Sequence, residues 1–315
     1  MKKNLLRAAA TLGALSLSLA VGAVSVGSAQ AAIPASQRAV LTHTTKPVTY
    51  KLLWAQDFNA KKAGAIDPKV WSYDTGVGLN GELEYNTNST KNILVDGKGH
   101  LLINAYRISD SSFNQTTTSK ADTALLKRCS YYCQFASGKI KTASKVGFKY
   151  GRMEARMKVP AGLGTWPAFW MLGASLTQGD TWPDCGEIDI LETRGSMDSV
   201  AFGTIHGPGY SGGSGKGSVY DNRSTLTAGY HTFAIEWLKD VINFYVDGNQ
   251  YFKVTKADVA PNQWVYNSEF YLILNLAMGG EFTGDIDPAL NKAQLAVDYI
   301  HYYSINGQGK VYLHK

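Results

Sequence analysis

The stretch GEIDILETRG places three carboxylates within six residues, at Glu187, Asp189 and Glu192. Successive side chains of a strand point to opposite faces, so Glu187 and Asp189 share one face. Strict alternation would turn Glu192 into the core, where an unpaired carboxylate is costly or takes up a proton. A one-residue bulge at Ile190-Leu191 returns Glu192 to the face of the other two acids. We therefore expect a bulged strand whose three acids line one surface.

Three acids on one surface suit the hydrolysis of a glycosidic bond. One carboxylate attacks the sugar carbon, and a second, held protonated, gives its proton to the leaving oxygen. A third acid between them raises a neighbour's pKa by like-charge repulsion and shares a proton with it. At ~3.3 Å per residue the Cα atoms of Glu187 and Glu192 lie more than ~10 Å apart. Retention requires carboxyl groups ~5–5.5 Å apart, so the two glutamates must lean together, and the spacing alone also allows inversion.

The alternative for this segment taken alone is an edge strand with its acids in water and its isoleucines in the core. Glu192 argues against it, because an edge strand gives no reason for the break in alternation.

The segments that must position these acids are short and strand-like. They are rich in Tyr, Phe, Ile and Val, often alternate in polarity, and are separated by Gly, Asn, Asp and Pro. The Asp-Gly of residues 246–249 predicts a hairpin turn. Helical periodicity is nearly absent, and only LTAGY and PALNKAQ are expected to form helical turns. The pattern predicts an all-β sandwich or barrel, with strands in LLWAQDF, HLLINAYRI, YGRMEARMKV, FGTIHG, YHTFAIEWL, VINFYVDG, FYLILNLAM and LAVDYIHYY.

The 315-residue chain begins with a basic start, an apolar middle and Ala29-Gln30-Ala31. This pattern predicts a secretory signal peptide over residues 1–31. A membrane anchor is the alternative, but Ala, Ser and Gly dilute the apolar run. Residues 32–49 form a polar lead-in that we expect to be flexible, and residues 50–315 are expected to form a single catalytic domain. The mature protein is expected to be secreted, monomeric and free of the membrane.

Charge says little about partners. The chain has 31 Lys and Arg against 25 Asp and Glu, and three basic residues lie in the leader, which leaves a net charge of +3. No basic run is interleaved with aromatic residues, so nucleic acid is not expected as a partner.

Three cysteines follow the leader, at Cys129, Cys133 and Cys185. Export permits a disulfide. Cys129 and Cys133 are near enough to pair locally, which would leave Cys185 free. Pairing of Cys185 with either of the others is the alternative, and the sequence does not choose between them.

GEIDILE resembles the E-x-D-x-x-E signature of glycoside hydrolase family 16, in the bulged form of laminarinases and agarases. HGPGYSGG resembles bacterial endo-β-1,3-glucanases in particular. The resemblance runs from about Lys51 to Tyr303, with segments in family order: NGELEYNT (80–87), YGRMEARMKVPAGLGTWPAFWMLG (150–173), TIHGPGYSGG (204–213), HTFAIEWLKDVINFYVDG (231–248), FYLILNLAMGG (270–280) and LAVDYIHYY (295–303).

This resemblance implies a jelly-roll sandwich of two antiparallel sheets with a concave substrate cleft, and hydrolysis with retention. By position, Glu187 resembles the nucleophile, Glu192 the acid/base and Asp189 the assisting acid between them. The bulge places all three acids on one surface, but their roles come from the resemblance. No cofactor is required for this chemistry.

Candidate substrate-binding residues flank the acids. Sugar rings pack their C–H faces on aromatic planes, and Trp166, Trp170 and Trp182 are near the acid strand in sequence, with core positions as the alternative. Trp166 and Trp170 lie four residues apart, on one face of a plain strand, while the neighbours of Trp166 and Trp182 also suggest loops. His206 matches a family histidine near the acid/base, where it can tune protonation. Asn80 and Glu82 match positions on the glycone side of the cleft.

Two further expectations concern binding. Arg107 is a candidate sugar contact. The family often holds a structural Ca²⁺, and the matching positions are Asp57, Asp298 and a backbone carbonyl near Gly97, which are oxygen donors of the kind that calcium prefers. Two surface aspartates are the alternative, because Gln56-Asp57 replaces the family's Asp-Glu.

The resemblance implies an endo-β-1,3-glucanase that acts on laminarin-like β-glucan. Alternatives are a mixed-linkage β-1,3-1,4-glucanase, a galactan hydrolase or a transglycosylase of the same family, and a non-catalytic β-glucan-binding protein. The segment GGEFTGD (279–285) departs from the family's G-G-N-W-P-G, which predicts a change at the far end of the cleft.

Overall fold

Runs of β-branched and aromatic residues build nearly all of the regular structure, as their strand preference predicts. The computed structural model describes residues 47–108, 120–130 and 132–314. These residues belong to one compact unit that begins at Pro47. The expected signal peptide, and all of the expected lead-in before Pro47, lie outside the described residues.

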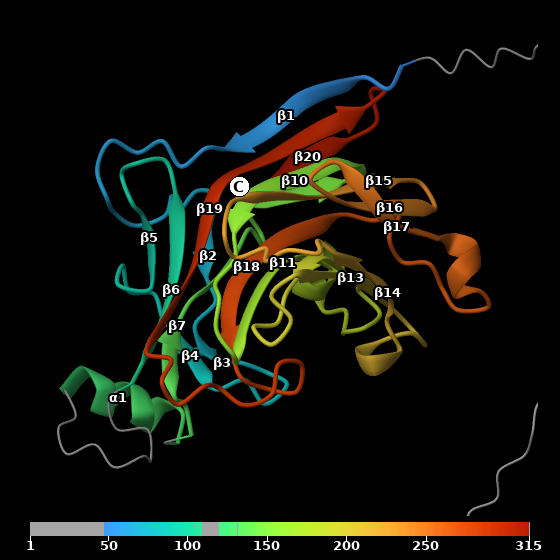
Figure 1. Cartoon of the computed structure of the whole chain (residues 1–315). Helices are drawn as coiled ribbons and strands as arrows, with labels where there is room; N and C mark the ends of the chain where they lie inside the picture. Colours follow the sequence, from blue (N-terminus) through green and yellow to red (C-terminus); the bar gives the residue numbers. More distant parts are fainter. Residues whose placement is uncertain (1–46, 109–119, 131, 315) are drawn as a thin grey trace, which may run out of the picture. The chain divides into compact units, whose positions relative to one another are not determined.

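The strands form two sheets (Figure 1). The 11-stranded sheet has the order β17-β16-β15-β10-β19-β6-β7-β4-β3, with β1 paired to β19 and β5 to β6. Its strands are β1 (Tyr50–Gln56), β3 (Gly76–Val77), β4 (Glu84–Asn86), β5 (Ile93–Val95), β6 (Leu101–Arg107), β7 (Phe135–Ser137), β10 (Gly151–Lys158), β15 (His231–Leu238), β16 (Val241–Val246), β17 (Asn249–Thr255) and β19 (Lys292–Ile305).

The 9-stranded sheet has the order β14-β13-β12-β11-β18-β8-β2, with β9 paired to β18 and β20. Its strands are β2 (Ser72–Tyr73), β8 (Lys139–Lys141), β9 (Val146–Lys149), β11 (Thr165–Gly173), β12 (Glu187–Glu192), β13 (Val200–His206), β14 (Lys216–Asp221), β18 (Phe270–Met278) and β20 (Lys310–Leu313). Every pairing among the described strands is antiparallel except that of β4 with β7. The expected sandwich of antiparallel sheets is confirmed.

The core lies between the sheets. Along β10, Met153, Ala155 and Met157 are buried while the residues between them face outward, as alternation requires. Across the layers, Trp237 on β15 meets Phe270 on β18 edge-on, with ring centroids 5.4 Å apart. All nine residues of β18 are buried, which explains its nearly continuous apolar sequence.

The turns and helices show where sequence patterns succeed and fail. The hairpin between β16 and β17 is confirmed, and its turn residues Asp247 and Gly248 have φ of 49° and 78°. The two expected helical turns are wrong, because LTAGY and PALNKAQ form turns and the start of β19. The described residues instead contain the helix α1 (Lys120–Arg128), beyond the ends of β4 and β7 (Figure 1). Three 3₁₀ segments also lie in the described part of the chain: η2 (Ala174–Gln178), η3 (Gly212–Ser214) and η4 (Lys256–Val259).

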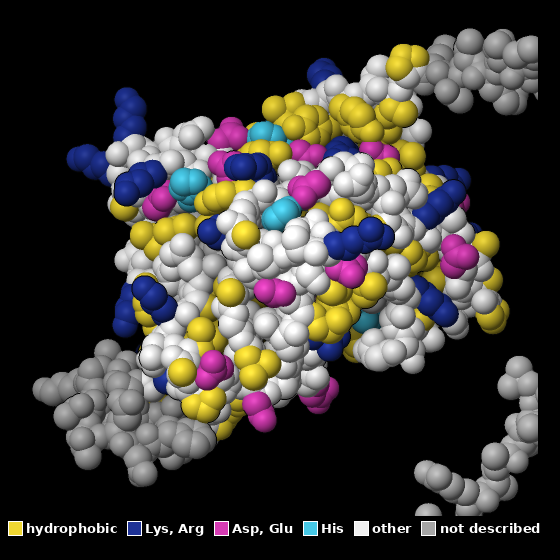
Figure 2. All heavy atoms as spheres, in the orientation of Figure 1, with side chains coloured by type: hydrophobic (Ala, Val, Ile, Leu, Met, Phe, Trp, Pro, Cys, Tyr) yellow, Lys and Arg dark blue, Asp and Glu magenta, His cyan; other side chains and the backbone are white. Residues whose placement is uncertain are grey.

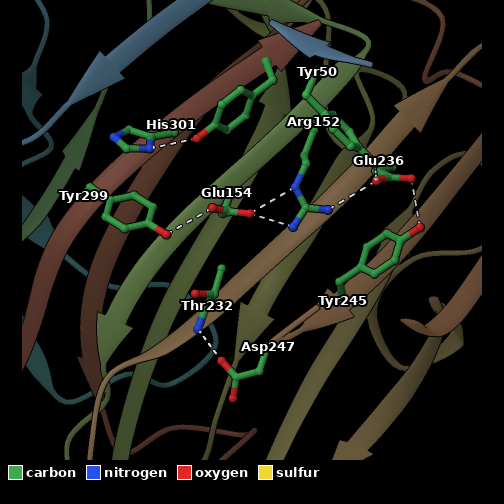
Figure 3. A network of polar contacts seen from close by, with 10 residues as sticks. Tyr50, Arg152, Glu154, Thr232, Glu236, Tyr245, Asp247, Tyr299 and His301 are labelled. Carbon is green, nitrogen blue, oxygen red and sulfur yellow. Dashed lines mark hydrogen bonds and ion pairs between the residues drawn. The ribbon is translucent and has the colours of Figure 1, made fainter. Parts of the chain in front are cut away.

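The outer face of the larger sheet carries a network of charged and phenolic side chains (Figure 3). Arg152 on β10 contacts Glu154 at 2.6 Å and Glu236 on β15 at 3.3 Å. Phenolic groups surround this triad: Tyr50 and Tyr245 donate to Glu236, and Tyr299 donates to Glu154. The network links β1, β10, β15, β16 and β19, on the sheet that does not hold the acid strand.

The face of the molecule in Figure 2 mixes positive and negative side chains without a large field of one sign. Hydrophobic side chains gather along its upper edge, where β1 exposes Tyr50, Leu52 and Leu53. None of the helices in the described part of the chain has the length and apolar character needed to cross a membrane.

Candidate active site

The acid strand is β12, and it contains the predicted bulge. On the β11 side, Leu191 pairs with Phe169 and Asp189 with Trp170, so Ile190 has no partner of its own. Both Ile190 and Leu191 are buried, at 2% and 0% exposure. Two consecutive core-facing residues thus take up the break in alternation, and all three acids line one cleft on the smaller sheet. The bulge predicted from Glu192 is confirmed.

The cleft brings together residues from distant parts of the chain. Asn80, Glu82, Trp166 and Trp170, all predicted from the sequence, line it together with the three acids. Its remaining lining residues are Leu79, Lys139, Ala168 and Asn275. Trp182 and His206 contact the acids directly, so all six predicted substrate-binding residues lie at this site.

Each glutamate accepts a hydrogen bond from an indole. The Nε1 of Trp166 donates to Oε1 of Glu192 at 2.8 Å, and the Nε1 of Trp182 donates to Oε2 of Glu187 at 2.7 Å. Trp182 lies in the turn before β12, as expected, and is 46% exposed. Trp166 lies within β11 rather than in a loop, because the β11 ladder continues through it to Thr165. The two indoles fix the carboxylates and present aromatic surface beside them.

Trp170 shares the cleft-facing side of β11 with Trp166, as the four-residue spacing predicts. Its Nε1 donates to Oδ1 of Asn275 on β18 at 2.7 Å, and Nζ of Lys139 on β8 lies 5.0 Å from its ring centroid. Asn275 and Lys139 were missed by the sequence analysis. Asn275 could have been found from the sequence, because it is the single amide in the apolar run FYLILNLAM.

His206 lies on β13 directly opposite Glu187 in the strand ladder. Its Nε2 is 3.1 Å from Oδ2 of Asp189, although the contact lacks the alignment of a good hydrogen bond. The expectation placed this histidine near the acid/base Glu192, whereas its closest acidic contact is Asp189. Because Tyr266 donates to the backbone carbonyl of His206 at 2.7 Å, the end of β13 is held in place.

The three acids hold protons more tightly than isolated carboxyl groups do. Burial, followed by the charge of Asp189, raises the pKa of Glu187 well above its usual range. Burial, followed by the charge of Glu192, does the same to the pKa of Asp189. Burial raises the pKa of Glu192 to about 7, and the hydrogen bond from Trp166 opposes this rise. At neutral pH the cluster can therefore supply a proton as well as a carboxylate.

A second pair of acids lies beside the cleft on the segment GELEYN. Glu84 is fully buried and accepts hydrogen bonds from the backbone N–H of Met278 at 2.8 Å and from Nδ2 of Asn86 at 3.2 Å. Burial raises the pKa of Glu84 and also that of Glu82, its neighbour in the cleft. Glu84 was missed, although the alternation of Glu82 and Glu84 around Leu83 places them on one face.

The two aspartates predicted as calcium ligands each contact a basic side chain. Oδ1 of Asp57 contacts Nε2 of His301 at 2.7 Å, and Asp298 forms an ion pair with Arg156. Gly97 lies against backbone atoms of residues 62–63. Within the described part of the chain, the only cluster of three metal-binding side chains is Glu187, Asp189 and His206, in the cleft itself. Histidine and arginine thus contact the two carboxylates, and the calcium site stays a prediction.

Arg107 contacts the protein rather than the cleft. Its Nε and Nη2 donate to the backbone carbonyls of Leu290 and Asp287, both at 2.9 Å. Its planar group lies 4.8 Å from the ring centroid of Phe135. These contacts hold the loop before β19, and the expected sugar contact is not supported.

The three cysteines are free thiols and all are buried. Cys129 and Cys133 share a small cluster with Ile108 and Leu126, whereas Cys185 lies in another cluster with Leu172. The expected alternative, a disulfide between Cys185 and Cys129 or Cys133, is therefore wrong. Cys129 and Cys133 lie in the same cluster, as the local pairing requires, but no disulfide joins them.

Comparison with known proteins agrees with this geometry. Residues 85–301 match the model of Glycosyl hydrolases family 16, which covers more than half of the chain. The chain is 37% identical over 275 residues to glucan endo-1,3-beta-glucosidase A1 of Niallia circulans, with 80% of this chain but only 37% of that protein covered. It is 33% identical to a beta-glucanase of Rhodothermus marinus, with 81% of this chain and 85% of that protein covered.

The fold matches as well. The X-ray structure of the endo-beta-1,3-glucanase from Pyrococcus furiosus aligns with a TM-score of 0.70 at 36% sequence identity, covering 81% of this chain and 95% of that one. A family match of this extent, on a sandwich with three acids along a bulged strand, identifies the chain as a glycosidase. The chain belongs to glycosyl hydrolases family 16.

Proposed function

We propose that the protein is a secreted, monomeric, endo-acting glycosidase that cleaves internal β-1,3-glucosidic bonds of laminarin-like glucans with retention. The observation that carries the proposal is the pair of glutamates on β12, each hydrogen-bonded by an indole, on one wall of an aromatic-lined cleft. The β-1,3 linkage rests on the similarity to endo-1,3-β-glucanases. Secretion rests on the leader pattern of residues 1–31.

The proposed reaction has two steps. In the first, a carboxylate oxygen of Glu187 bonds to the anomeric carbon while the glycosidic bond breaks, and Glu192 gives its proton to the departing oxygen. In the second, Glu192 takes a proton from water, whose oxygen bonds to the anomeric carbon as the bond to Glu187 breaks. Asp189 lies between the two glutamates, and its charge state influences the protonation of both.

Trp182 and His206 support the nucleophile. Because the indole N–H of Trp182 stabilises the ionised form, it lowers the pKa of Glu187 against the effect of burial. The nearby His206 acts in the same direction. Trp166 and Trp170 present ring surface on which sugar C–H faces can pack, with Asn80, Glu82, Lys139 and Asn275 available to sugar hydroxyls.

Reducing-sugar release by wild type and Glu187→Gln tests this proposal. The substrates are laminarin, curdlan, barley mixed-linkage glucan, agarose and carrageenan. We expect release from laminarin and curdlan by wild type alone, because glutamine keeps the shape of the side chain but cannot form the glycosyl-enzyme. Comparable activity in Glu187→Gln would contradict the nucleophile assignment.

Two further outcomes separate the alternatives. Preferential release from barley glucan or agarose would identify a mixed-linkage or galactan hydrolase. Binding to curdlan with no release from any substrate would identify a non-catalytic glucan-binding protein. NMR of the first products should show the β-anomer, and α-anomers would exclude retention.

A further inference from the structure

A second group of aromatic rings lies away from the cleft, on the outer face of the larger sheet (Figure 3). It consists of Tyr50 on β1, Tyr245 on β16, and Tyr299 and Tyr303 on β19. The tyrosines of β16 and β19 alternate with buried residues, so their side chains point outward. We call these four residues the tyrosine platform. The proposed reaction uses none of them.

The rings of the tyrosine platform are held by their hydroxyl groups. Tyr50 and Tyr245 donate to the two carboxylate oxygens of Glu236, the second at 2.8 Å. Tyr299 donates to Oε1 of Glu154 at 3.1 Å. A tyrosine has few rotatable bonds, and these contacts already restrict them. A ligand that packs on the rings therefore loses little of its binding free energy to the ordering of side chains.

Arg152 lies beside the faces of two of these rings. Its Cζ is 5.3 Å from the ring centroid of Tyr245 and 5.9 Å from that of Tyr50. The side chain of Arg152 is only 14% exposed, whereas Tyr50 is 47% exposed. Apolar surface continues beside the rings at Leu52, which pairs with Tyr303 and is 49% exposed. The guanidinium is thus covered, while aromatic and apolar surface faces the solvent.

The charges beneath and beside the platform are paired. Arg152 contacts both Glu154 and Glu236, and Arg156 also forms an ion pair on this face. Burial, followed by the hydrogen bond to Glu236, raises the pKa of Tyr50 to about 12, so this phenol is uncharged at neutral pH. A surface of paired charges and neutral phenols complements a ligand without net charge. Nucleic acid would need unpaired cations instead.

The platform is long enough for more than one sugar ring. Tyr245 on β16 and Tyr303 on β19 are separated by β15 and β10 in the sheet. Three steps between neighbouring strands, at ~4.8 Å each, place them ~14 Å apart. The C–H faces of sugar rings pack on aromatic planes, and sugar hydroxyls bond to phenol and carboxylate oxygens. A neutral glucan chain has both kinds of group at each sugar unit.

We infer that the tyrosine platform is a second glucan-binding site, which holds a neutral β-glucan chain on the larger sheet while the cleft on the smaller sheet remains free. The choice of β-glucan as the ligand rests on the proposed function. Because the two sites lie on different sheets, a polysaccharide with many chains engages both at once. Two linked sites bind such a particle more tightly than either site alone, which keeps the enzyme on insoluble glucan between cuts.

Binding of the mature chain to insoluble curdlan tests this inference. Every protein in the test also carries Glu187→Gln, so that the polysaccharide is not consumed, and depletion from solution gives the dissociation constant. The platform variants are Tyr50→Ala and Tyr245→Ala, with Tyr50→Phe and Tyr245→Phe as variants that keep the ring. Tyr312→Ala is the control. Tyr312 is a partly exposed tyrosine on β20 of the smaller sheet, and Nζ of Lys310 lies 4.3 Å from its ring centroid.

We expect each substitution by alanine to raise the dissociation constant for curdlan about three- to tenfold, the size of one aromatic contact. Tyr50→Phe and Tyr245→Phe should bind nearly as the parent does, although each loses a hydrogen bond to Glu236 and should unfold at lower urea concentration. Binding would then depend on the ring and stability on the hydroxyl, which a purely structural network would not produce. Tyr50→Leu keeps apolar volume without a ring, so it replaces Tyr50→Ala if that variant does not fold.

Four outcomes would overturn the inference. If the alanine variants bind curdlan as the parent does, the platform takes no part in glucan binding. If Tyr312→Ala weakens binding equally, the effect is not local. If the phenylalanine and alanine variants weaken binding alike, in proportion to their unfolding midpoints, the network only supports the fold. A dimer in sedimentation that Tyr50→Ala dissociates, with binding unchanged, would assign this face to a second copy of the chain.

Failure of the proposed function would give a different result. Wild type would then release no sugar from laminarin or curdlan. If its binding to curdlan still depended on Tyr50 and Tyr245, the second site would be supported although the glycosidase assignment had failed.

Discussion

At the scale of single residues, the site is defined by two pairs, each of one indole and one carboxylate. Glu192 and Glu187 are both in a desolvated cleft, and each accepts one strong N–H donor. Burial favours the protonated acid, while the indole favours the carboxylate. The balance leaves Glu192 with a pKa of about 7. A group with a pKa near neutral pH can give up a proton in one step and recover it in the next.

The pair of Trp166 and Glu192 predicts a change in pH dependence. In the proposed mechanism Glu192 must be protonated for the first step, so we expect activity below its pKa and its loss as pH rises through about 7. Trp166→Phe removes a donor that stabilises the carboxylate, so the pKa should rise and the basic limb of kcat/KM should move up by about one pH unit. Profiles of kcat/KM against pH on laminarin measure this shift.

Trp182→Phe is the matched control for that experiment. It removes the donor to Glu187 instead, so the pKa of Glu187 should rise. The acidic limb of kcat/KM should then move to higher pH, while the basic limb stays in place. A basic limb that stays fixed or moves down in Trp166→Phe would contradict the assignment of Glu192 as the acid/base.

At the scale of elements, the acid strand shows what a sequence can and cannot predict. The bulge followed from residues adjacent in sequence, since only an inserted residue reconciles the acids with buried isoleucines. Asn275 and Lys139 reach the same cleft from β18 and β8, and their place depends on strand order, which no local pattern contains. The helix α1 was missed because its nine residues, KADTALLKR, are fewer than the window in which helical periodicity can be recognised. No local pattern predicted that His301 and Arg156 contact Asp57 and Asp298 across strands.

Gly203 offers a prediction at this scale, because it faces the bulge from β13. The residues paired on either side of the bulge are Asp189 with Thr204 and Glu192 with Phe202, so Ile190 and Leu191 both lie opposite Gly203. A Cβ at Gly203 would come 2.2 Å from Oη of Tyr251 and 2.7 Å from Cδ1 of Phe244. Gly203→Ala should lower the free energy of unfolding by about 1–3 kcal/mol through overpacking, measured by urea denaturation.

Gly213→Ala is the control for Gly203→Ala. An added Cβ there has no heavy atom within 4 Å, so we expect a change within about 0.5 kcal/mol. If both substitutions changed the free energy of unfolding equally, the contacts opposite the bulge would not limit the size of the side chain at position 203.

At the scale of the whole molecule, the two outer faces have different roles. The smaller sheet carries the cleft, with acids kept close together in spite of their repulsion. The larger sheet carries the Arg152 network, whose charges are compensated by one another (Figure 3). We expect the cleft face to govern the chemistry. We expect the Arg152 network to contribute to the stability of the whole domain, because both sheets pack on one core.

Arg152→Met tests this division. The side chains of Arg152, Glu154 and Glu236 are only 14–15% exposed, so removing the cation leaves two neighbouring carboxylates uncompensated. The free energy of unfolding should fall by about 3–5 kcal/mol, while kcat on laminarin below the unfolding transition should not change. Lys141→Met is the control, since its contact with Asp74 is about one-third exposed and should contribute about 1 kcal/mol or less. A loss of kcat in folded Arg152→Met would show that the faces are not independent.

The two indole–carboxylate hydrogen bonds also give the protein an optical property. Trp166 and Trp182 are two of its seven tryptophans, and each donates to an acid that changes charge in the proposed reaction. The emission of an indole responds to a charge at its N–H, so protonation of Glu192 and Glu187 should be visible as titrations of intrinsic fluorescence. Comparing the titration of wild type with those of Trp166→Phe and Trp182→Phe would assign each transition to one acid. The resting enzyme would thus report its own charge state without a substrate or an added dye.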